Sequence, residues 1–344
     1  MAQSSTASSR FVDAIQRLQP RLELVERSMR EQLHGATNPL PQLGGQVIGS
    51  GGKRLRPALL IWAAEICGYT GPRCIQVAAA VELLHTATLL HDDVVDVSEL
   101  RRGRPSANSI WGNRRAVLAG DFFYARASSM IVEDGNQDIL WVFANTIRCM
   151  AEGELLQLEG SFDIAATEAH YFSVIEYKSA ALLAASCEAG SILGGVTRAE
   201  RRKLSEFGRE LGLAFQLRDD ALDYVAGEGE LGKPPHGDLR EGKITLPLLL
   251  TLKRCAPAEH ELLGAVLKSA ARALGTDEGR QGQASDLDLG PALELVERYR
   301  GVADTIRRAE SHVTRAIAAI AAFPDGRVKR DLIAAAHFAV GRDH

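Results

Sequence analysis

The spacing of apolar residues is the feature that most restricts what this chain can fold into. Near the start, apolar residues recur every three or four positions, at Phe11, Ile15, Leu18, Leu22, Val25, Met29 and Leu33. This spacing predicts a helix with one buried stripe, and Pro20 within it predicts a kink or a restart. Runs of alternating β-branched and aromatic residues are almost absent, so we expect no sheet. The same helical spacing covers roughly 54–68, 75–98, 114–134, 137–159, 168–193, 199–225, 243–254, 258–273, 287–299, 302–323 and 327–340.

The remaining segments predict loops rather than domain boundaries. Residues 1–10 are rich in serine and predict a disordered tail, a simpler interpretation than a transit peptide. Glycine and proline punctuate 35–52 and predict a loop there. Residues 226–242 and 275–286 predict surface excursions, and the helical pattern resumes directly after each. We therefore predict one all-α domain over residues 11–344.

Composition excludes several classes of protein. The chain has 344 residues and a formal net charge of -4 without a basic block, which disfavours a nucleic-acid partner. Its five cysteines are scattered without a CxxC pair, so a disulfide framework or zinc site is not expected. No uncharged apolar run reaches the roughly 18 to 20 residues that span a bilayer. We therefore expect a protein of the reducing cytoplasm.

Two aspartate motifs suggest the chemistry. HDDVVDVSELRRGRP, at 91–105, contains Asp92, Asp93 and Asp96 at helical spacing. One DDxxD motif is a weak signal, because a solvated helix end often looks the same. However, FQLRDDALD repeats the spacing after another apolar helix, with Asp219, Asp220 and Asp223. Two such helices face to face would gather up to six carboxylates. Mg²⁺ prefers oxygen ligands and commonly bridges to phosphates, so the pair predicts a Mg²⁺ site and a phosphorylated ligand.

Basic residues recur beside glycines or next to these motifs. None forms a P-loop, since GSGGKRLRP lacks the GxxxxGK[ST] spacing. Lys and Arg side chains can hold phosphate oxygens directly, so the set predicts a second anionic group bound without metal. His85 shares the helical face of Asp92, as either a structural or a phosphate-binding imidazole. The basic residues are Lys53, Arg54, Arg56, Arg101, Arg102, Lys178, Lys233 and Lys243.

Taken in order, these motifs resemble a known family. GGKRLRP, HTATLLHDDVVDVSELRRGRPSAN, FQLRDDALDY and DLREGKITLPLL are similar to the motifs of the trans-isoprenyl diphosphate synthases, above all the medium- and long-chain members. The resemblance runs from about Phe11 to the C-terminal HFAVGRDH. It implies a bundle of about ten or more helices around a deep central cavity, usually as a homodimer.

The resemblance also assigns roles by position. It implies that Asp92, Asp96 and Asp219 are the main ligands of about three Mg²⁺ ions, with Asp93, Asp220 and Asp223 in support. Gln216 and Ser179 would lie near the reacting carbon. Residues matching the allylic diphosphate contacts are Arg101, Lys178 and Lys243. Those matching the isopentenyl diphosphate contacts are Lys53, Arg56, His85 and Arg102, with Lys233 as a further substrate-binding residue. Two departures are KSA at 178–180, where the family usually has KTA, and Arg218, where it usually has an apolar residue.

Product length in this family depends on the cavity below the first motif. Ala87 and Thr88, just before Asp92, are both small, which implies an open floor and long products. Phe122, Phe123 and Met130 are candidates for a deeper stop, although each is individually more typical of ordinary core.

The implied activity is condensation of isopentenyl diphosphate with an allylic diphosphate. The expected product is an all-trans polyprenyl diphosphate of about octaprenyl length, for a quinone side chain. Because this product would be very apolar, we expect the protein to make transient contact with a membrane surface. A shorter-chain synthase, a subunit of a heteromeric synthase and a terpene cyclase are the alternatives. Intact aspartate motifs disfavour a silent subunit, and the basic set around Lys53 would have no purpose in a cyclase.

Overall fold

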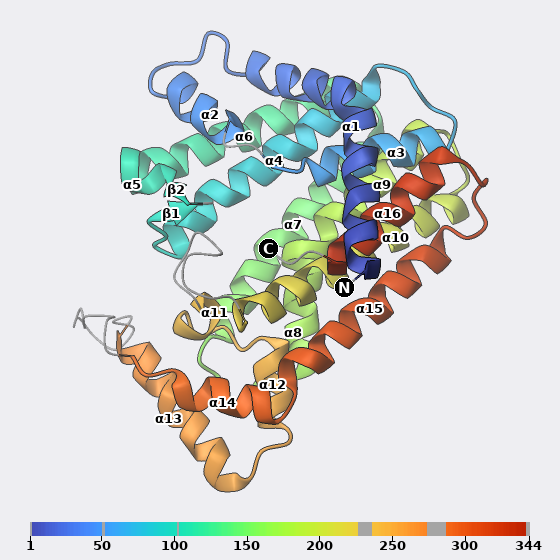
Figure 1. Ribbon diagram of the computed structural model, residues 1–344. Helices are drawn as coiled ribbons and strands as arrows, with labels where there is room; N and C mark the ends of the chain where they lie inside the picture. Colours follow the sequence, from blue (N-terminus) through green and yellow to red (C-terminus); the bar gives the residue numbers. More distant parts are fainter. Residues whose placement is uncertain (1, 50–51, 102, 226–235, 274–286, 342–344) are drawn as a thin grey trace.

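Helices make up nearly all of the regular structure of this computed structural model, which describes residues 2–49, 52–101, 103–225, 236–273 and 287–341 (Figure 1). The all-α prediction is confirmed. In chain order the elements are α1 (Ala2–Glu31), α2 (Leu40–Gly49), α3 (Leu55–Ile66), α4 (Arg73–Val95), β1 (Leu100–Arg101), β2 (Arg104–Pro105), α5 (Ala107–Trp111), α6 (Asn113–Asp134), α7 (Gln137–Glu159), α8 (Glu168–Ile175), a π-helical turn (Glu176–Ala180), α9 (Ala181–Leu193), α10 (Arg198–Asp223), α11 (Gly237–Arg240), α12 (Leu246–Leu252), α13 (Pro257–Ala273), α14 (Gly290–Arg298), α15 (Gly301–Ala319) and α16 (Arg327–Gly341).

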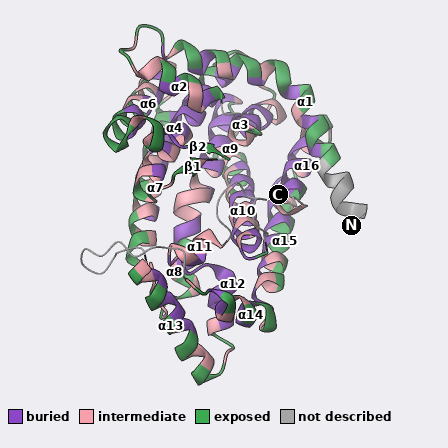
Figure 2. Cartoon of the chain, turned by 60° about the vertical axis from the view of Figure 1, so that its left-hand side comes forward, coloured by how far each residue is buried: buried purple, intermediate pink, exposed green. Residues whose placement is uncertain are grey.

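The core consists of two clusters of buried apolar residues. The larger lies among α1 to α7, α9, α10, α15 and α16, and the smaller lies among α8, α10 and α12 to α15. Figure 1 shows α12, α13 and α14 gathered at one end, with α1 beside α16. Figure 2 shows exposed residues along the outer helix faces and buried ones facing inwards. Because α10 belongs to both clusters, the helix that carries the second aspartate motif is anchored along most of its length.

Several boundaries differ from the sequence predictions. Helix α1 begins at Ala2, within the predicted tail, and it continues through Pro20. The predicted loop at 35–52 contains α2, because Leu43 and Ile48 are buried there and tertiary packing outweighs the weak helix propensity of glycine and proline. The two-residue strands β1 and β2 form a small hairpin where no strand was predicted. The described part of the predicted excursion at 226–242 includes α11, and 275–286 lies outside the described residues.

Among the residues that the structure describes, one helix, α4, is long and apolar enough to span a membrane by length and composition. Its most apolar window has a mean hydropathy of 1.3, and 72% of that window is buried inside the protein. It packs against α3, α6 and α9, as expected of a central helix in a bundle.

The stretch predicted as one helix at 168–193 contains the π-helical turn, whose formation depends on two close approaches. A Cβ at Gly153 of α7 would lie 2.7 Å from the backbone nitrogen of Lys178. A Cβ at Gly212 of α10 would lie 2.5 Å from the Cα of Ala180. The turn is therefore held between α7 and α10 where both lack side chains. Such turns occur often at functional sites, and this one carries Lys178 and Ser179.

We predict that Gly212→Ala lowers the free energy of unfolding by about 1–3 kcal/mol, because the added methyl group must displace packed backbone. Urea unfolding followed by circular dichroism measures this. Gly45→Ala is the matched control, since nothing lies within 4 Å of a Cβ at that helical position. Its stability should stay equal or rise slightly. Equal effects in the two variants would contradict the close approach at Gly212.

Candidate active site

A cavity of about 910 Å³ opens between the helices that carry the aspartate motifs. Its wall comes from the start of α3, from α4, α6, α7, the π-helical turn, α9, α10 and α16. Apolar side chains such as Leu183 and Phe215 lie alongside charged ones. The structure brings together eleven of the sequence-predicted residues on this wall: Lys53, Arg54, Arg56, His85, Thr88, Asp92, Arg101, Lys178, Ser179, Gln216 and Asp219. The cavity therefore combines charge with apolar lining.

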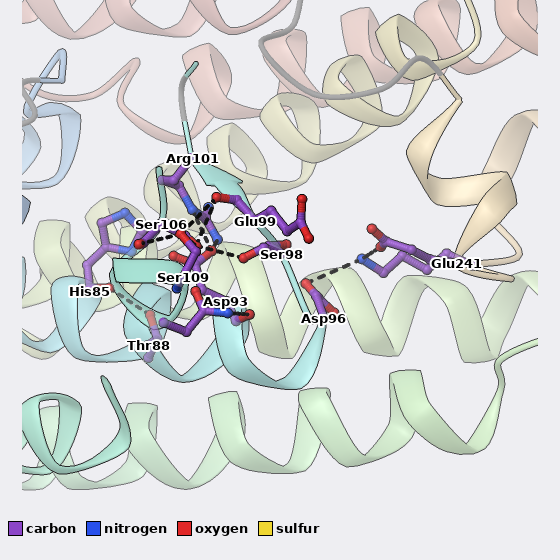
Figure 3. A network of polar contacts seen from close by, with 12 residues as sticks. His85, Thr88, Asp93, Asp96, Ser98, Glu99, Arg101, Ser106, Ser109 and Glu241 are labelled. Carbon is purple, nitrogen blue, oxygen red and sulfur yellow. Dashed lines mark hydrogen bonds and ion pairs between the residues drawn. The ribbon is translucent and has the colours of Figure 1, made fainter. Parts of the chain in front are cut away.

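The first aspartate motif divides between three environments at the end of α4. Asp92 lines the cavity. Asp93 is buried and accepts hydrogen bonds from Nε and Nη2 of Arg101, with the Nε bond at 2.9 Å. Asp96 follows the helix, with its Oδ2 3.8 Å from Nζ of Lys243. Figure 3 shows Arg101 beside Asp93 at the hairpin, whereas Asp96 points towards the segment of Glu241. Only Asp92 of the three lines the cavity.

The second motif divides in the same way on α10. Asp219 lines the main cavity, opposite the end of α4. Asp220 is buried and accepts hydrogen bonds from the hydroxyl of Tyr171 at 2.5 Å and from Nε2 of Gln216 at 2.8 Å. Asp223 accepts hydrogen bonds from the backbone N–H groups of Gly237 and Asp238, at 3.0 and 3.1 Å. The second and third aspartates are thus held by protein groups.

Burial and mutual repulsion raise the pKa of several of these acids. Burial raises the pKa of Asp92 to about 6, where Lys178 lowers it and Glu154 and Asp96 raise it further. Burial and Asp238 raise the pKa of Asp220 to about 8. Burial likewise raises the pKa of Asp223 to about 6 and that of Asp238 to about 7. A dication among these groups would favour their ionised forms.

Lysines occupy the wall between the two motifs. Nζ of Lys178 lies 2.6 Å from Oε2 of Glu154 on α7. Nζ of Lys243 lies 2.5 Å from Oε2 of Glu241. Burial opposes the charge of Lys243, but Asp238, Asp96 and Glu241 outweigh it and raise the pKa of this ammonium. Lys243 therefore remains cationic beside the acids.

Ser179 and Gln216 form a pair across the cavity wall. The Ser179 hydroxyl donates to Oε1 of Gln216 at 2.6 Å, and Nε2 of Gln216 donates onward to Asp220. Tyr171 completes this chain by donating to the other oxygen of Asp220. A smaller cavity of about 140 Å³ adjoins it, lined by Asp220, Asp238 and Lys243 among others. The orientation of the Gln216 amide is therefore fixed from both sides.

The sequence prediction needs refinement at several positions. Arg101, predicted to contact diphosphate, pairs with Asp93, which was predicted to support the metal. Ala87 is buried and does not belong to the cavity wall, whereas Thr88 does. Phe123 and Met130 are ordinary core, and Tyr124 rather than Phe122 lines the cavity. Arg102 and Lys233 lie outside the described residues.

Sequence reasoning missed four residues of this site. Glu154, Tyr171, Asp238 and Glu241 all contact predicted residues. Asp238 and Glu241 lie inside DLREGK, the motif in which only Lys243 had a predicted role. Glu154 and Tyr171 carry no local signal, because their partners are distant in the sequence.

The donor set fits Mg²⁺. Within the described ranges, no three His, Cys, Asp or Glu side chains are already gathered tightly enough to hold a metal. Asp92 and Asp219 nevertheless line one cavity, and both offer only carboxylate oxygens. Mg²⁺ usually takes one or two carboxylates and completes its shell with water and phosphate oxygens. Separated acids around a space for diphosphate satisfy that preference.

Fold and site together define a class: an all-α protein in which two aspartate motifs and several cations surround one cavity that also has an apolar lining. The family model described as polyprenyl synthetase matches residues 38–277, and the chain belongs to this family of prenyltransferases. Octaprenyl diphosphate synthase of Escherichia coli (strain K12) is 40% identical over 319 residues, which is 93% of this chain and 95% of that protein. The resemblance inferred from the motifs is therefore confirmed, and the chain is a trans-prenyl diphosphate synthase.

Solved structures agree with this assignment. A polyprenyl synthase from Caulobacter crescentus CB15, complexed with calcium and isoprenyl diphosphate, has a TM-score of 0.87 at 40% identity, covering 97% of this chain and 98% of that one. A decaprenyl diphosphate synthase from Rhodobacter capsulatus has a TM-score of 0.86 at 36% identity, covering 96% and 98%.

The raised pKa of Asp92 predicts a pH-dependent gain in stability on replacing it. In the folded chain this pKa is about 6, against about 3.9 when unfolded. The folded state therefore binds more protons between these values, and wild-type stability falls as the pH rises through that window. With chelator present, Asp92→Asn should gain up to about 2–3 kcal/mol at pH 8 and roughly half of that at pH 5.

Urea unfolding at the two pH values measures this gain. Asp13→Asn, which changes an exposed acid on α1, is the control and should change stability little at either pH. A loss of stability in Asp92→Asn at pH 8 would show that Lys178 already compensates the buried charge.

Proposed function

We propose that this chain is a Mg²⁺-dependent synthase that condenses isopentenyl diphosphate with an allylic diphosphate, making an all-trans polyprenyl diphosphate of about octaprenyl length. The observation that carries the proposal is the single cavity that combines Asp92 and Asp219 with Lys178 and an apolar lining. Bound Mg²⁺ would be held by Asp92, Asp96 and Asp219 and would neutralise charge developing on the departing diphosphate.

The protein's own side chains account for the remaining steps. Lys178, on the cavity wall, and Lys243, which lies 3.8 Å from Asp96, would stabilise the diphosphate as the allylic carbon–oxygen bond breaks and the electron pair leaves with oxygen. The double bond of isopentenyl diphosphate then forms the new carbon–carbon bond with the allylic cation. Ser179 and Gln216, which are hydrogen-bonded to each other on the cavity wall, would lie beside the reacting carbon. The released diphosphate takes the proton that is lost, so no protein base is required. Because the double bond supplies the electron pair of the new bond, no protein nucleophile is required either.

Chain length is proposed on two grounds. Thr88 lines the cavity with a short side chain whose hydroxyl donates to the carbonyl of His85 in its own helix, at 2.8 Å. Two similar relatives carry long-chain products in their names, an octaprenyl diphosphate synthase at 40% identity and a nonaprenyl diphosphate synthase of Rhodobacter capsulatus at 37%. A short-chain isoprenyl diphosphate synthase from Methanothermobacter thermautotrophicus is 33% identical to this chain. A shorter product is therefore the alternative.

The proposed partner is a second copy of the chain. Leu118 and Val132 on α6 and Trp141, Leu155 and Leu158 on α7 are more than half exposed. Apolar side chains on two neighbouring outer helices commonly mark association. A sizing column should therefore give about twice the chain mass of 37.1 kDa. Elution as a monomer that gains activity only with another protein would instead favour a heteromeric synthase, as in the heptaprenyl synthase component 2 of Geobacillus stearothermophilus, 33% identical.

We also propose a cytoplasmic location, with the product passed to a membrane surface for quinone side-chain synthesis. The support is the apolar nature of such a product and the resemblance of the motifs. Measuring the side-chain length of cellular quinones after deletion of the gene tests this destination. Unchanged quinones would contradict it.

Sizing the extracted products tests the function. The purified chain, with isopentenyl diphosphate, farnesyl diphosphate and Mg²⁺, should yield products of about octaprenyl length, and chelator should abolish them. Product of only geranylgeranyl length would retain the enzyme class and contradict the chain-length proposal. Absence of condensation with any allylic primer would contradict the function itself.

A paired variant tests the cavity floor in the same assay. Thr88→Phe adds a large side chain to the wall and should shorten the products, whereas Thr88→Val, of similar shape, should leave their length unchanged. Equal product lengths in both variants would show that growth does not pass Thr88.

A further inference from the structure

Glu82 is a buried acid outside both aspartate motifs and outside the set of residues assigned above. It lies on α4, the helix that ends in the first motif, and only 5% of it is exposed. Its Oε1 accepts a hydrogen bond from Nη1 of Arg54 at 2.9 Å, and within the described ranges its Oε2 accepts none. A buried carboxylate needs a cationic partner. Arg54 supplies that charge to Glu82.

Arg54 is held in an unusual conformation at the start of α3. Its φ of 46° and ψ of 41° are left-handed, a region that residues other than glycine seldom adopt. Three side-chain contacts hold it there: Glu82, Oε1 of Glu26 at 3.0 Å, and the carbonyl of Ile48 at 2.5 Å. Burial lowers the pKa of Arg54, but Glu82 and Glu26 outweigh this and raise it. The guanidinium is therefore a charged, fixed anchor.

The anchor lies between two cations of the main cavity. Lys53 precedes it and Arg56 follows it by two positions, and both line the cavity wall. Nζ of Lys53 lies 4.3 Å from the centroid of the buried Phe338 ring. Because α3 begins at Leu55, the backbone angles of Arg54 set the directions in which both side chains leave the chain. Displacement of Arg54 would thus move both cations.

We propose that Glu82, acting through Arg54, is a positioning residue for the isopentenyl diphosphate subsite. It ties the cation-bearing start of α3 to α4, so the subsite of Lys53 and Arg56 keeps a fixed relation to the aspartates of α4. This inference rests on the proposed function. This role differs from that of a purely structural ion pair, because loss of the pair should weaken the binding of isopentenyl diphosphate and leave the binding of the allylic diphosphate unchanged.

Kinetics on two variants test the role. Glu82→Gln keeps the size of the side chain and removes its charge. Arg54→Lys keeps the charge and removes the guanidinium that contacts Glu82, Glu26 and the Ile48 carbonyl together. Each should raise KM for isopentenyl diphosphate by about 10–100-fold, by analogy with the loss seen when a residue that orients a metal ligand is removed. KM for farnesyl diphosphate and kcat at saturating isopentenyl diphosphate should change by less than about threefold. Arg30→Gln removes only the exposed ion pair to Glu26 and is the control, with no change expected.

Calorimetric titration with isopentenyl diphosphate gives the second measurement and should show the same loss of affinity. Equal rises in both KM values would contradict the positioning role and leave Glu82 and Arg54 as structural support only. The same conclusion would follow from an unchanged KM for isopentenyl diphosphate with a lowered Tm. If the wild type elongates farnesyl diphosphate and both variants keep a normal KM, the inference alone fails. If the wild type neither binds isopentenyl diphosphate nor turns over, the proposed function fails and the inference with it.

Discussion

The burial of several carboxylates close to one another is the constraint on which the rest of this site depends. Two helices end in aspartates at one cavity, and burial raises the pKa of Asp92, Asp220 and Asp223. The protein compensates part of this charge with Lys178, Lys243 and hydrogen-bond donors. The first acid of each motif remains on the cavity wall. Divalent cations and a diphosphate would complete this balance, which explains how so many charged side chains can share one cavity wall with apolar ones.

The helical scaffold makes this arrangement rigid. Gly153 and Gly212 let α7 and α10 approach the π-helical turn that carries Lys178 and Ser179. On the outer side, Arg209 donates to Glu176 at the start of that turn at 2.8 Å. Arg209 also pairs with the buried Glu210, which accepts a hydrogen bond from Arg315 of α15 at 2.8 Å. The π-helical turn is thus connected through α10 to α15, a helix that does not line the cavity.

Much of this could be predicted from the sequence, because helices and the aspartate motifs are local patterns. Apolar spacing predicted the long helices, and the motifs predicted that Asp92, Asp219 and Lys178 share one cavity. What could not be predicted depends on distant partners. The pairing of Lys178 with Glu154, the bond from Tyr171 to Asp220 and the left-handed Arg54 follow from tertiary packing. Helix α2 formed for the same reason, since its buried face outweighs its weak propensity.

The central claim is that the two aspartate motifs bind metal jointly with a diphosphate. Calorimetric titration of Mg²⁺ into the protein, with and without inorganic pyrophosphate, tests this without relying on turnover. We expect Mg²⁺ to bind tightly only when pyrophosphate is present, and Asp92→Asn and Asp219→Asn each to abolish that binding. Tight Mg²⁺ binding that survives either substitution, or that needs no pyrophosphate, would contradict a site shared between α4 and α10.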